Sequence, residues 1–393
     1  MAADPVVLLS ARRTPIGAFQ GIFSGTSATH LGTSAIKAAL DDAGVDPAAI
    51  DEVLMGCVLP AGLGQAPARQ AAIGAGIPTS APCTTVNKMC GSGMKAIMQG
   101  YDAIVAGSAE VVVAGGLESM TNAPYLLPKA RGGYRMGHQQ VLDHMFTDGL
   151  QDVYEGHMMG HYAENTADKY GYTREQQDAF AIESVTRAQA AAADGRFANE
   201  ITPVTFATRK GDVTVSEDET PNTVSVEKIP TLRPAFRKDG TVTAASSSSI
   251  SDGAAAVVLA SASYAEANGL EPVARITAHS SFAQDPAWFT TAPIAAIERL
   301  HRRLDWTPDD VDLYEINEAF AVVAMAAIQD AKLDHAKTNI NGGACALGHP
   351  VGATGARITT TLIHALKARG LKRGVASLCI GGGEATALGI EIV

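Results

Sequence analysis

Apolar and polar positions along the chain follow two patterns, one typical of strands and one typical of amphipathic helices. The stretches AEVVVAGGLESM (109–120) and RGVASLCIGGGEATALGIEIV (373–393) each begin as an apolar strand that ends in glycines. The stretch REQQDAFAIESVTRAQAAAADG (174–195) has apolar residues at helical spacing, with Gly195 as a C-terminal stop. Strands that alternate with helices and end in glycine-rich turns predict an α/β protein with helix-covered sheets.

Three pairs of segments repeat the same pattern in the two parts of the chain. The pairs are 41–58 with 303–320, 83–107 with 337–370, and 109–120 with 373–393. The first pair predicts a helix end, a turn with proline and a short strand. The second predicts a strand, a glycine-rich turn and an amphipathic helix, and the third begins with an apolar strand. We therefore expect two similar half-molecules.

The repeat places two reactive residues in related positions. Cys90 follows Asp51 at nearly the same spacing at which His349 follows Asp312. Cys90 and His349 therefore occupy equivalent turns of the two halves, and packing of the halves would bring these turns toward a common centre.

A segment of different character separates the halves. Residues 121–245 are rich in Gly, Met, His and charge, and are predicted to form an inserted loop domain. The N-terminal half is then expected to comprise 1–120 plus 246–271, because a serine run leads the chain back into an apolar strand and helix. The C-terminal half is expected to comprise 272–393.

Composition and charge narrow the function. The chain has 393 residues with 46% hydrophobic and 18% charged residues, which fits two or three domains that share a large core. A net charge of −11 argues against binding to nucleic acid or anionic membranes. No apolar run is long enough for a transmembrane helix, and the N-terminus lacks the features of a signal or transit peptide. We expect a cytoplasmic protein.

Five cysteines at wide spacings include no CxxC pair, so we expect free thiols and no metal site. Cys90 lies directly before a Gly-Ser-Gly turn at the foot of a predicted helix, where backbone N–H groups would lower the pKa of a thiol. Packing of a small buried residue is the alternative. His349 lies in a rigid Gly/Pro turn, which favours a general base.

Two further residues end strands of the repeat. Cys379 precedes three glycines whose N–H groups could face an oxyanion, although a core cysteine is the alternative. Asn317 could hold a water, although a helix N-cap is the more frequent use of Asn at such a position. Together these residues indicate a catalytic site built from both halves.

Eight motifs then resemble the thiolase family in family order and cover essentially the whole chain. They are RTPIGAFQG, VNKMCGSGMKAI, GGLESMTNAPY, LRPAFRKDGTVTA, SDGAAAVVLA, INEAFA, NGGACALGHPVGATGAR and LCIGGGEATALGIE. The resemblance implies a thiolase fold, with two βαβαβαββ halves packed as αβαβα layers and an inserted loop domain. The stretches GTVTAAS, SDGAAA and WFTTAP are most similar to short-chain members, which join two acetyl-CoA into acetoacetyl-CoA and CoA.

The resemblance also implies roles. Cys90 would become acylated, His349 would take its proton, and Cys379 would be the acid/base of the condensation. Asn317, through a water, would form one oxyanion hole, and the N–H groups of Cys90 and Gly381 would form another.

Binding and assembly are implied in the same way. CoA would be a substrate and product, with no other cofactor, and residues 132–140 would form the loop that assembles a homotetramer. The implied substrate contacts are Ser248, Met159, Phe236, Phe320 and Lys228.

Three departures from the family pattern concern substrate binding. Met158 stands where short-chain members often carry histidine, with His157 beside it. The loop after the acidic run has no Arg and no basic residue before Lys228, and Phe289 stands where some acetyl-specific members place Met.

Other functions remain as alternatives. The nearest is a 3-ketoacyl-CoA thiolase that acts on longer chains. A decarboxylating ketoacyl synthase would be expected to lack Cys379 in its CIGGG context, and a non-catalytic acyl-CoA-binding member would be expected to lack Cys90 or His349. A hydrolytic cysteine enzyme fits less well, because two cysteines suit transfer to a thiol.

Overall fold

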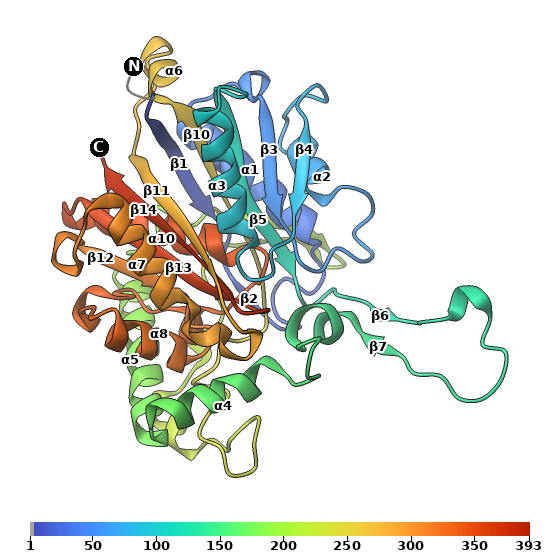
Figure 1. The fold of residues 1–393 in the computed structure, drawn as a ribbon. Coiled ribbons are helices and arrows are strands. Elements are labelled where there is room, and N and C mark those ends of the chain that lie inside the picture. The colour runs from blue at the N-terminus through green and yellow to red at the C-terminus, as the bar shows by residue number, and fades with distance from the viewer. Residues whose placement is uncertain (1–3) are drawn as a thin grey trace.

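The two halves of the repeat form the two ends of one mixed sheet of ten strands (Figure 1). The computed structural model describes residues 4–393. The strand order is β12-β13-β14-β11-β1-β10-β5-β3-β4, with β2 beside β10. The halves meet at β1 and β11, which pair through only two residues of each strand.

The main sheet and the helices have the following bounds. The strands of the main sheet are β1 (Val6–Arg13), β2 (Gly17–Ala18), β3 (Glu52–Gly56), β4 (Cys83–Val86), β5 (Val111–Ser119), β10 (Ser251–Ser261), β11 (Ala274–Ala283), β12 (Leu313–Ile316), β13 (Arg373–Ile380) and β14 (Glu384–Ile392). The helices are α1 (Ala28–Ala43), α2 (Pro67–Gly74), α3 (Ser92–Val105), α4 (Met159–Tyr170), α5 (Arg174–Ala193), α6 (Ala262–Ala267), α7 (Ala292–Leu304), α8 (Ala321–Asp330), α9 (Ala344–Leu347) and α10 (Thr354–Arg369).

The predicted repeat is visible in strand order and in matched hydrogen bonds. The N-terminal half runs β4-β3-β5-β10-β1 and the C-terminal half runs β12-β13-β14-β11, with parallel pairs first and antiparallel pairs after them. Asp51 Oδ2 accepts two backbone N–H groups where β5 begins, at 2.7 and 3.0 Å. Asp312 Oδ2 accepts two where β13 begins, at 2.9 and 2.8 Å. The two aspartates thus have the same structural role in each half.

One predicted strand differs. The segment 337–370 was expected to begin with a strand equivalent to β4, but the structure has only an isolated bridge between Tyr314 and Thr338 at that position. Asn339, next to Thr338, has a left-handed φ of 50°, and its side chain bonds the backbone of Ile316 at 2.8 Å in both directions. Side-chain bonds therefore replace the ladder beyond this bridge.

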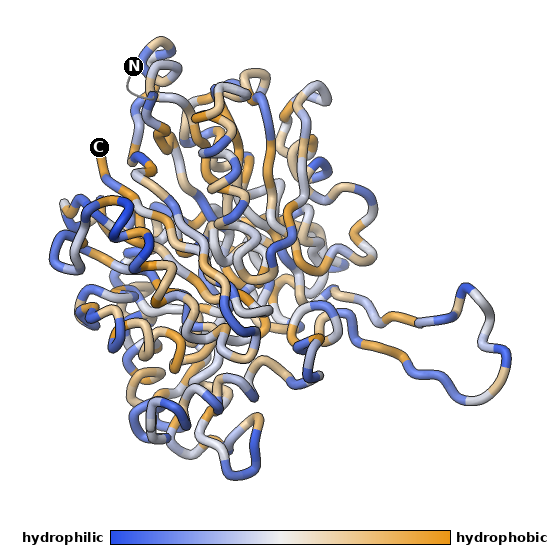
Figure 2. Tube along the Cα trace, in the orientation of Figure 1, coloured by the Kyte–Doolittle hydropathy of each residue, from blue (hydrophilic) through white to orange (hydrophobic). Residues whose placement is uncertain are grey.

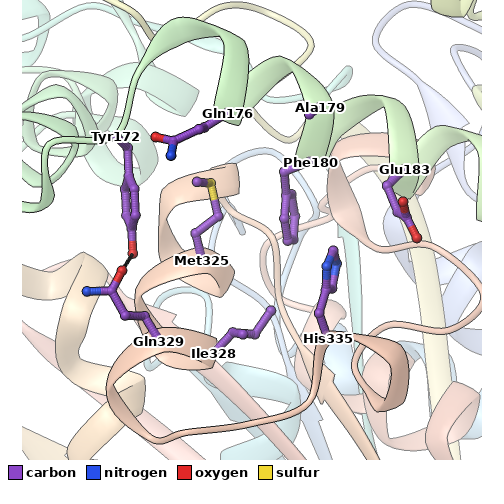
Figure 3. Close-up of a pocket in the computed structure, with 9 residues that line it drawn as sticks. All are labelled: Tyr172, Gln176, Ala179, Phe180, Glu183, Met325, Ile328, Gln329 and His335. Carbon is purple, nitrogen blue, oxygen red and sulfur yellow. Dashed lines mark hydrogen bonds between the residues drawn. The ribbon is translucent and has the colours of Figure 1, made fainter.

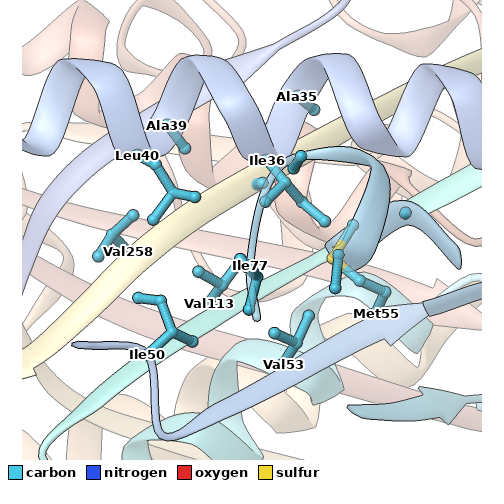
Figure 4. Close-up of a cluster of buried hydrophobic side chains, with 14 of the residues drawn as sticks. Ala35, Ile36, Ala39, Leu40, Ile50, Val53, Met55, Ile77, Val113 and Val258 are labelled. Atoms are coloured by element: carbon cyan, nitrogen blue, oxygen red, sulfur yellow. The ribbon is translucent and has the colours of Figure 1, made fainter. Parts of the chain in front are cut away.

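The two halves of the sheet lie on opposite sides of α3 and α10, which contact strands of both halves, so the fold has five layers. Helices α1 and α2 cover the outer face of the N-terminal half, and α7 and α8 cover that of the C-terminal half, while α3 and α10 pack together between the halves. Ile36 and Leu40 of α1 face Val113 and Val258 of the sheet (Figure 4). Burial of each such side chain stabilises the fold by about 1.5–3 kcal/mol. The predicted αβαβα arrangement is confirmed.

The segment between β5 and β10 leaves the sheet and returns to it (Figure 1). It contains a projecting arm with a short hairpin, β6 (Tyr125–Leu126) and β7 (Leu142–Asp143), a second hairpin, β8 (Val204–Thr208) and β9 (Gly211–Val215), and helices α4 and α5. The helix predicted at 174–195 is α5, which begins with a capping box at Thr173. The boundaries 121–245 for this segment as a domain stay a prediction.

A buried ion network ties this segment to the sheet. Arg13 of β1 donates from Nε to Glu200 at 2.6 Å and from both terminal nitrogens to Asp218 at 2.7 and 2.8 Å. All three side chains are buried, so each charge depends on its partners, and removal of one would leave an uncompensated charge in the core.

In the described part of the chain, no helix combines the length and the apolarity that crossing a membrane requires.

Candidate active site

Cys90 lies in a tight turn between β4 and α3. The preceding residue, Met89, has a left-handed φ of 47°, which is unusual for a residue with a side chain. The hydroxyl of Ser92 holds the turn, because it accepts the N–H of Lys88 at 2.8 Å and donates to the carbonyl of Met89 at 2.6 Å. A strained residue of this kind is typical of functional sites. Cys90 itself is half-buried.

Close contact between the first turns of α3 and α10 brings the Cys90 turn toward the His349 loop. A Cβ on Gly355 would lie 2.3 Å from the backbone N of Met94, and one on Gly93 would lie 3.0 Å from the N of Ala356. Only glycine allows this approach. Val351, two residues after His349, packs in the same apolar cluster as Cys90. The predicted meeting of the equivalent turns therefore has a structural basis.

His349 is buried and held by two hydrogen bonds. Its backbone N–H donates to the carbonyl of Ser249 at 3.1 Å, and its Nδ1 lies 2.6 Å from the hydroxyl oxygen of Thr354. Its Nε2 is buried without a hydrogen-bond partner among residues 4–393. Burial, reinforced by the nearby charge of Arg357, lowers the pKa of His349 to about 3. The imidazole is therefore neutral at physiological pH.

The expected lowering of the Cys90 pKa is wrong in its net direction. Burial raises the pKa of the thiol, while hydrogen bonds from the backbone N–H groups of Gly381 and of Cys90 itself oppose that rise only in part. The sequence shows the helix start but not the burial. Both shifts favour the uncharged forms, so we infer that the resting site holds a neutral thiol and a neutral imidazole and not a thiolate and an imidazolium.

Cys379 lies near the end of β13, close to the Cys90 turn. Its neighbour Ile380 packs against Gly91, where a Cβ would lie 2.4 Å from Ile380 Cδ1. Burial, together with the charge of a Cys90 thiolate, raises the pKa of Cys379 well above its ordinary value. Gly381 lies two residues after Cys379, and its N–H is one of the two backbone groups that oppose the rise of the Cys90 pKa.

Asn317 follows β12, which runs parallel to β13. Its backbone N–H donates to the carbonyl of Ser377, two residues before Cys379. The side chain is fully buried, and neither its oxygen nor its nitrogen has a hydrogen-bond partner within the described residues. A helix N-cap would have used that oxygen, so the side chain is available to a bound molecule.

Most of the predicted substrate contacts lie near Cys379. Phe320 packs in one apolar cluster with Cys379 and Met159, and Phe236 meets the Phe320 ring edge-on at a centroid distance of 5.8 Å. A Cβ on Gly381 would lie 3.5 Å from Met159 Sδ.

The other two predicted contacts differ from each other. Ser248 is half-buried and donates from Oγ to the carbonyl of Ala319 at 3.0 Å, beside Phe320. Lys228 is exposed on a short 3-10 helix, Val226–Thr231, and no ion pair of its side chain occurs among residues 4–393. The geometry therefore gives Lys228 no link to the other site residues.

Phe289, noted above as a departure from the family pattern, is fully buried in the cluster that contains Cys379. It meets Tyr162 edge-on at a centroid distance of 6.4 Å. Its ring therefore fills space next to the proposed acid/base.

The sequence analysis missed Glu118, at the end of β5. Its carboxylate accepts the N–H groups of Val58 at 2.9 Å and Leu59 at 3.1 Å, and that of Gly352 at 2.9 Å. It thus joins the loop after β3 to the His349 loop. Burial raises the pKa of Glu118 to about 7, although these N–H groups oppose the rise. The signal in the sequence was a single acidic residue within the otherwise uncharged segment VVVAGGLES, which forms β5.

Alkylation should distinguish the thiols. We expect iodoacetamide to modify Cys90 fastest, because Cys57, Cys345 and Cys379 are buried. Since burial raises the Cys90 pKa above 9.0, the rate should keep rising with pH past that value as thiolate forms. Peptide mapping across a pH series, with and without acetyl-CoA, measures both effects. The half-buried Cys83 is the internal control, which acetyl-CoA should not protect. A plateau of the Cys90 alkylation rate near neutral pH would contradict a protonated resting thiol.

A separate groove of about 440 Å³ lies between α5 and α8 (Figure 3). Tyr172, Phe180, Met325 and His335 are among the side chains that line it, and the ring of His335 stacks on Phe180. None of the residues predicted for the active site lines this groove.

Known proteins resemble this chain over essentially its whole length. Residues 6–263 match the family model described as thiolase, N-terminal domain, and residues 270–392 match that of the thiolase, C-terminal domain. The acetyl-CoA acetyltransferase of Cupriavidus necator is 51% identical, over 98% of this chain and 99% of its own. That of Schizosaccharomyces pombe is 47% identical over 100% of both.

Two solved structures have nearly the same fold as this chain. The acetyl-CoA acetyltransferase of Bacillus anthracis superposes with a TM-score of 0.97 and 42% identity over 100% of both chains. The Acat5 thiolase of Ascaris suum, solved in complex with coenzyme A, gives 0.94 and 44% over 99% of this chain and 100% of its own.

Proposed function

The chain belongs to the thiolase family, and we propose that it is an acetyl-CoA acetyltransferase that interconverts two acetyl-CoA with acetoacetyl-CoA and CoA. The observation that carries this proposal is that the Cys90 turn packs against Ile380, next to Cys379, and shares an apolar cluster with Val351 of the loop that holds the neutral His349 imidazole. Cys90 belongs to the N-terminal half, and His349 and Cys379 belong to the C-terminal half. The names of the relatives and solved structures support the same acyl group.

The first half-reaction acetylates Cys90. Its sulfur attacks the thioester carbon of acetyl-CoA, and the thiol proton passes to Nε2 of His349, whose lone pair has no protein partner in the described residues. CoA leaves with that proton, and the acetyl group remains on Cys90. The N–H groups of Cys90 and Gly381, which already face the sulfur, are suited to hold the developing oxyanion.

The second half-reaction forms the carbon–carbon bond. Cys379 first gives its thiol proton to Nε2 of His349 and, as thiolate, removes a proton from the methyl group of a second acetyl-CoA, whose thioester oxygen the protonated His349 and a water on Asn317 stabilise. The resulting enolate carbon attacks the acetyl carbon on Cys90, and the bond to Cys90 breaks. The Cys90 thiolate takes the proton held by His349, and Cys379 keeps the proton from the methyl group. Acetoacetyl-CoA then leaves, and both cysteines are thiols as in the resting state. The raised pKa of Cys379 makes its thiolate a strong base.

A chain-length series tests the acyl specificity. The thiolysis of acetoacetyl-CoA should exceed that of its 3-oxohexanoyl and 3-oxooctanoyl homologues in kcat/KM by at least 10-fold per added ethylene unit, because the Phe289 ring limits the space beside Cys379. Equal or rising kcat/KM along the series would favour a 3-ketoacyl-CoA thiolase of broader range. Absence of thiolysis with every substrate would reject both functions.

We also propose a homotetramer formed through the projecting arm. The arm exposes Tyr125, Leu127, Met136 and Val141 to solvent, with Met136 80% exposed, and Figure 2 shows apolar positions along it. Exposed apolar side chains on a thin hairpin favour burial against other copies. Sedimentation at micromolar concentration should give a tetramer that Met136→Asp weakens. Val213→Asp, an exposed site on β9, is the control. A stable monomer in the wild type would reject the proposal.

The compartment is proposed on chemical grounds. The five cysteines are free thiols, and a nucleophilic Cys90 requires a reducing environment such as the cytoplasm. Cell fractionation that finds the active protein in an oxidising compartment would contradict this.

A further inference from the structure

The contact between Thr354 and His349 bears on which nitrogen of the imidazole carries the proton. Thr354 is the first residue of α10 and is fully buried. Its Oγ1 lies 2.6 Å from Nδ1 of His349 and 2.9 Å from the carbonyl oxygen of Pro350. A hydroxyl has one hydrogen, and a carbonyl can only accept. The same carbonyl also accepts the backbone N–H groups of Ala353 at 2.9 Å and Thr354 at 3.0 Å. When the hydroxyl hydrogen of Thr354 is directed at Pro350, the Thr354 oxygen is left to accept from Nδ1 of His349.

This direction determines the state of the other ring nitrogen. In a neutral imidazole one nitrogen is a donor and the other is an acceptor. With Nδ1–H donating to Thr354, Nε2 carries the free lone pair, and Nε2 is the ring atom without a partner among residues 4–393. The opposite tautomer requires Thr354 to turn its hydrogen from Pro350 to Nδ1, and it would make Nε2 a buried donor without an acceptor among residues 4–393, which could not take a proton.

We propose that Thr354 is a positioning residue that holds His349 as the Nδ1–H tautomer, so that Nε2 can accept the proton of the Cys90 thiol. The proposal deepens the proposed function and rests on it for the role of Nε2. The neutral thiol makes this tautomer essential, since a thiol that keeps its proton at rest needs a base during attack.

A purely structural role for Thr354 has a matched comparison in the same helix. Thr359 is equally buried, and its hydroxyl donates to the carbonyl of Gly355 four residues earlier at 2.8 Å, as Thr354 does to Pro350. Thr359 has no contact with His349. Thr359→Val therefore removes the same kind of backbone bond without touching the imidazole.

Kinetics of three variants separate the two roles. Thr354→Val keeps the shape but removes the acceptor, and should slow acetylation of Cys90 by about 10²-fold, with KM for acetyl-CoA unchanged. Thr354→Ser restores the hydroxyl and should recover the rate to within about 3-fold. The acetylation rate of Thr359→Val should likewise stay within about 3-fold of the wild-type rate. Equal losses in Thr354→Val and Thr359→Val, or no rescue by serine, would overturn the proposal.

Neutron diffraction of the deuterated wild-type enzyme gives a test that needs no variant and no substrate. Deuterium on Nδ1 of His349 and none on Nε2 is the expected result. Deuterium on Nε2 alone would overturn the proposal even if Thr354→Val did not fold. Because the free enzyme is used, this result is independent of whether the enzyme condenses acetyl-CoA, so a failure of the proposed function would be seen separately in turnover.

Discussion

Replacing Cys90 by alanine is expected to abolish both acetylation of the protein and turnover of acetoacetyl-CoA. No other thiol can take its place, because Cys379 is fully buried and its raised pKa keeps it protonated. Removal of the nucleophile from a site that acts as a unit costs on the order of 10⁶-fold in rate. The measurement is intact mass after mixing with acetyl-CoA, alongside a thiolysis assay.

Cys83→Ala is the control for loss of a thiol. Cys83 is half-buried like Cys90 but lies at the start of β4, outside the site, so its loss should leave acetylation unchanged. An acetyl group still carried by the Cys90→Ala protein at a single position would show that another residue is the nucleophile.

Replacing Cys379 by alanine is expected to separate the two half-reactions. Acetylation of Cys90 should remain largely intact, because it uses His349 as its base. Condensation should fall by about 10²–10⁴-fold, the usual contribution of a positioned acid or base. Intact mass and the rate of acetoacetyl-CoA formation, measured on the same sample, give the two quantities.

The matched control is Cys345→Ala. Cys345 is also a buried thiol, but it lies in the short helix α9 and contacts Glu318 instead of Cys90. Near wild-type condensation by the Cys379→Ala enzyme would make Cys379 a packing residue. Loss of Cys90 acetylation in that variant would mean that the two thiols do not divide the work.

The different roles predicted for Cys90 and Cys379 follow from the way in which the two halves of the fold meet. The central layer contains one helix from each half, α3 and α10. Gly93 and Gly355 let the first turns of these two helices meet. The N-terminal half contributes the nucleophile at that point. The C-terminal half contributes a histidine at the equivalent turn and a second thiol on β13. A duplicated fold thus acquires one asymmetric site.

Much of the fold was predictable because its signals are local. The period of apolar residues gave strands and helices, and the repeat of short motifs gave two halves with Cys90 and His349 at equivalent turns. A glycine-rich turn after a strand is visible in a few consecutive letters. The one strand that failed, at Thr338, failed because side-chain bonds of Asn339 replaced its ladder, and those bonds join residues distant in sequence.

The tertiary structure alone decided the chemical state of the site. A helix start predicts a lowered thiol pKa, but burial by residues from both halves outweighs it at Cys90. Glu118 and Thr354 act through contacts with the His349 loop. Both lie in motifs that the sequence shows, but nothing along the chain indicates these contacts. Desolvation and hydrogen-bond direction depend on every group around a side chain. Sequence patterns record only the neighbours along the chain, so they identify the reactive residues but leave their protonation to the fold.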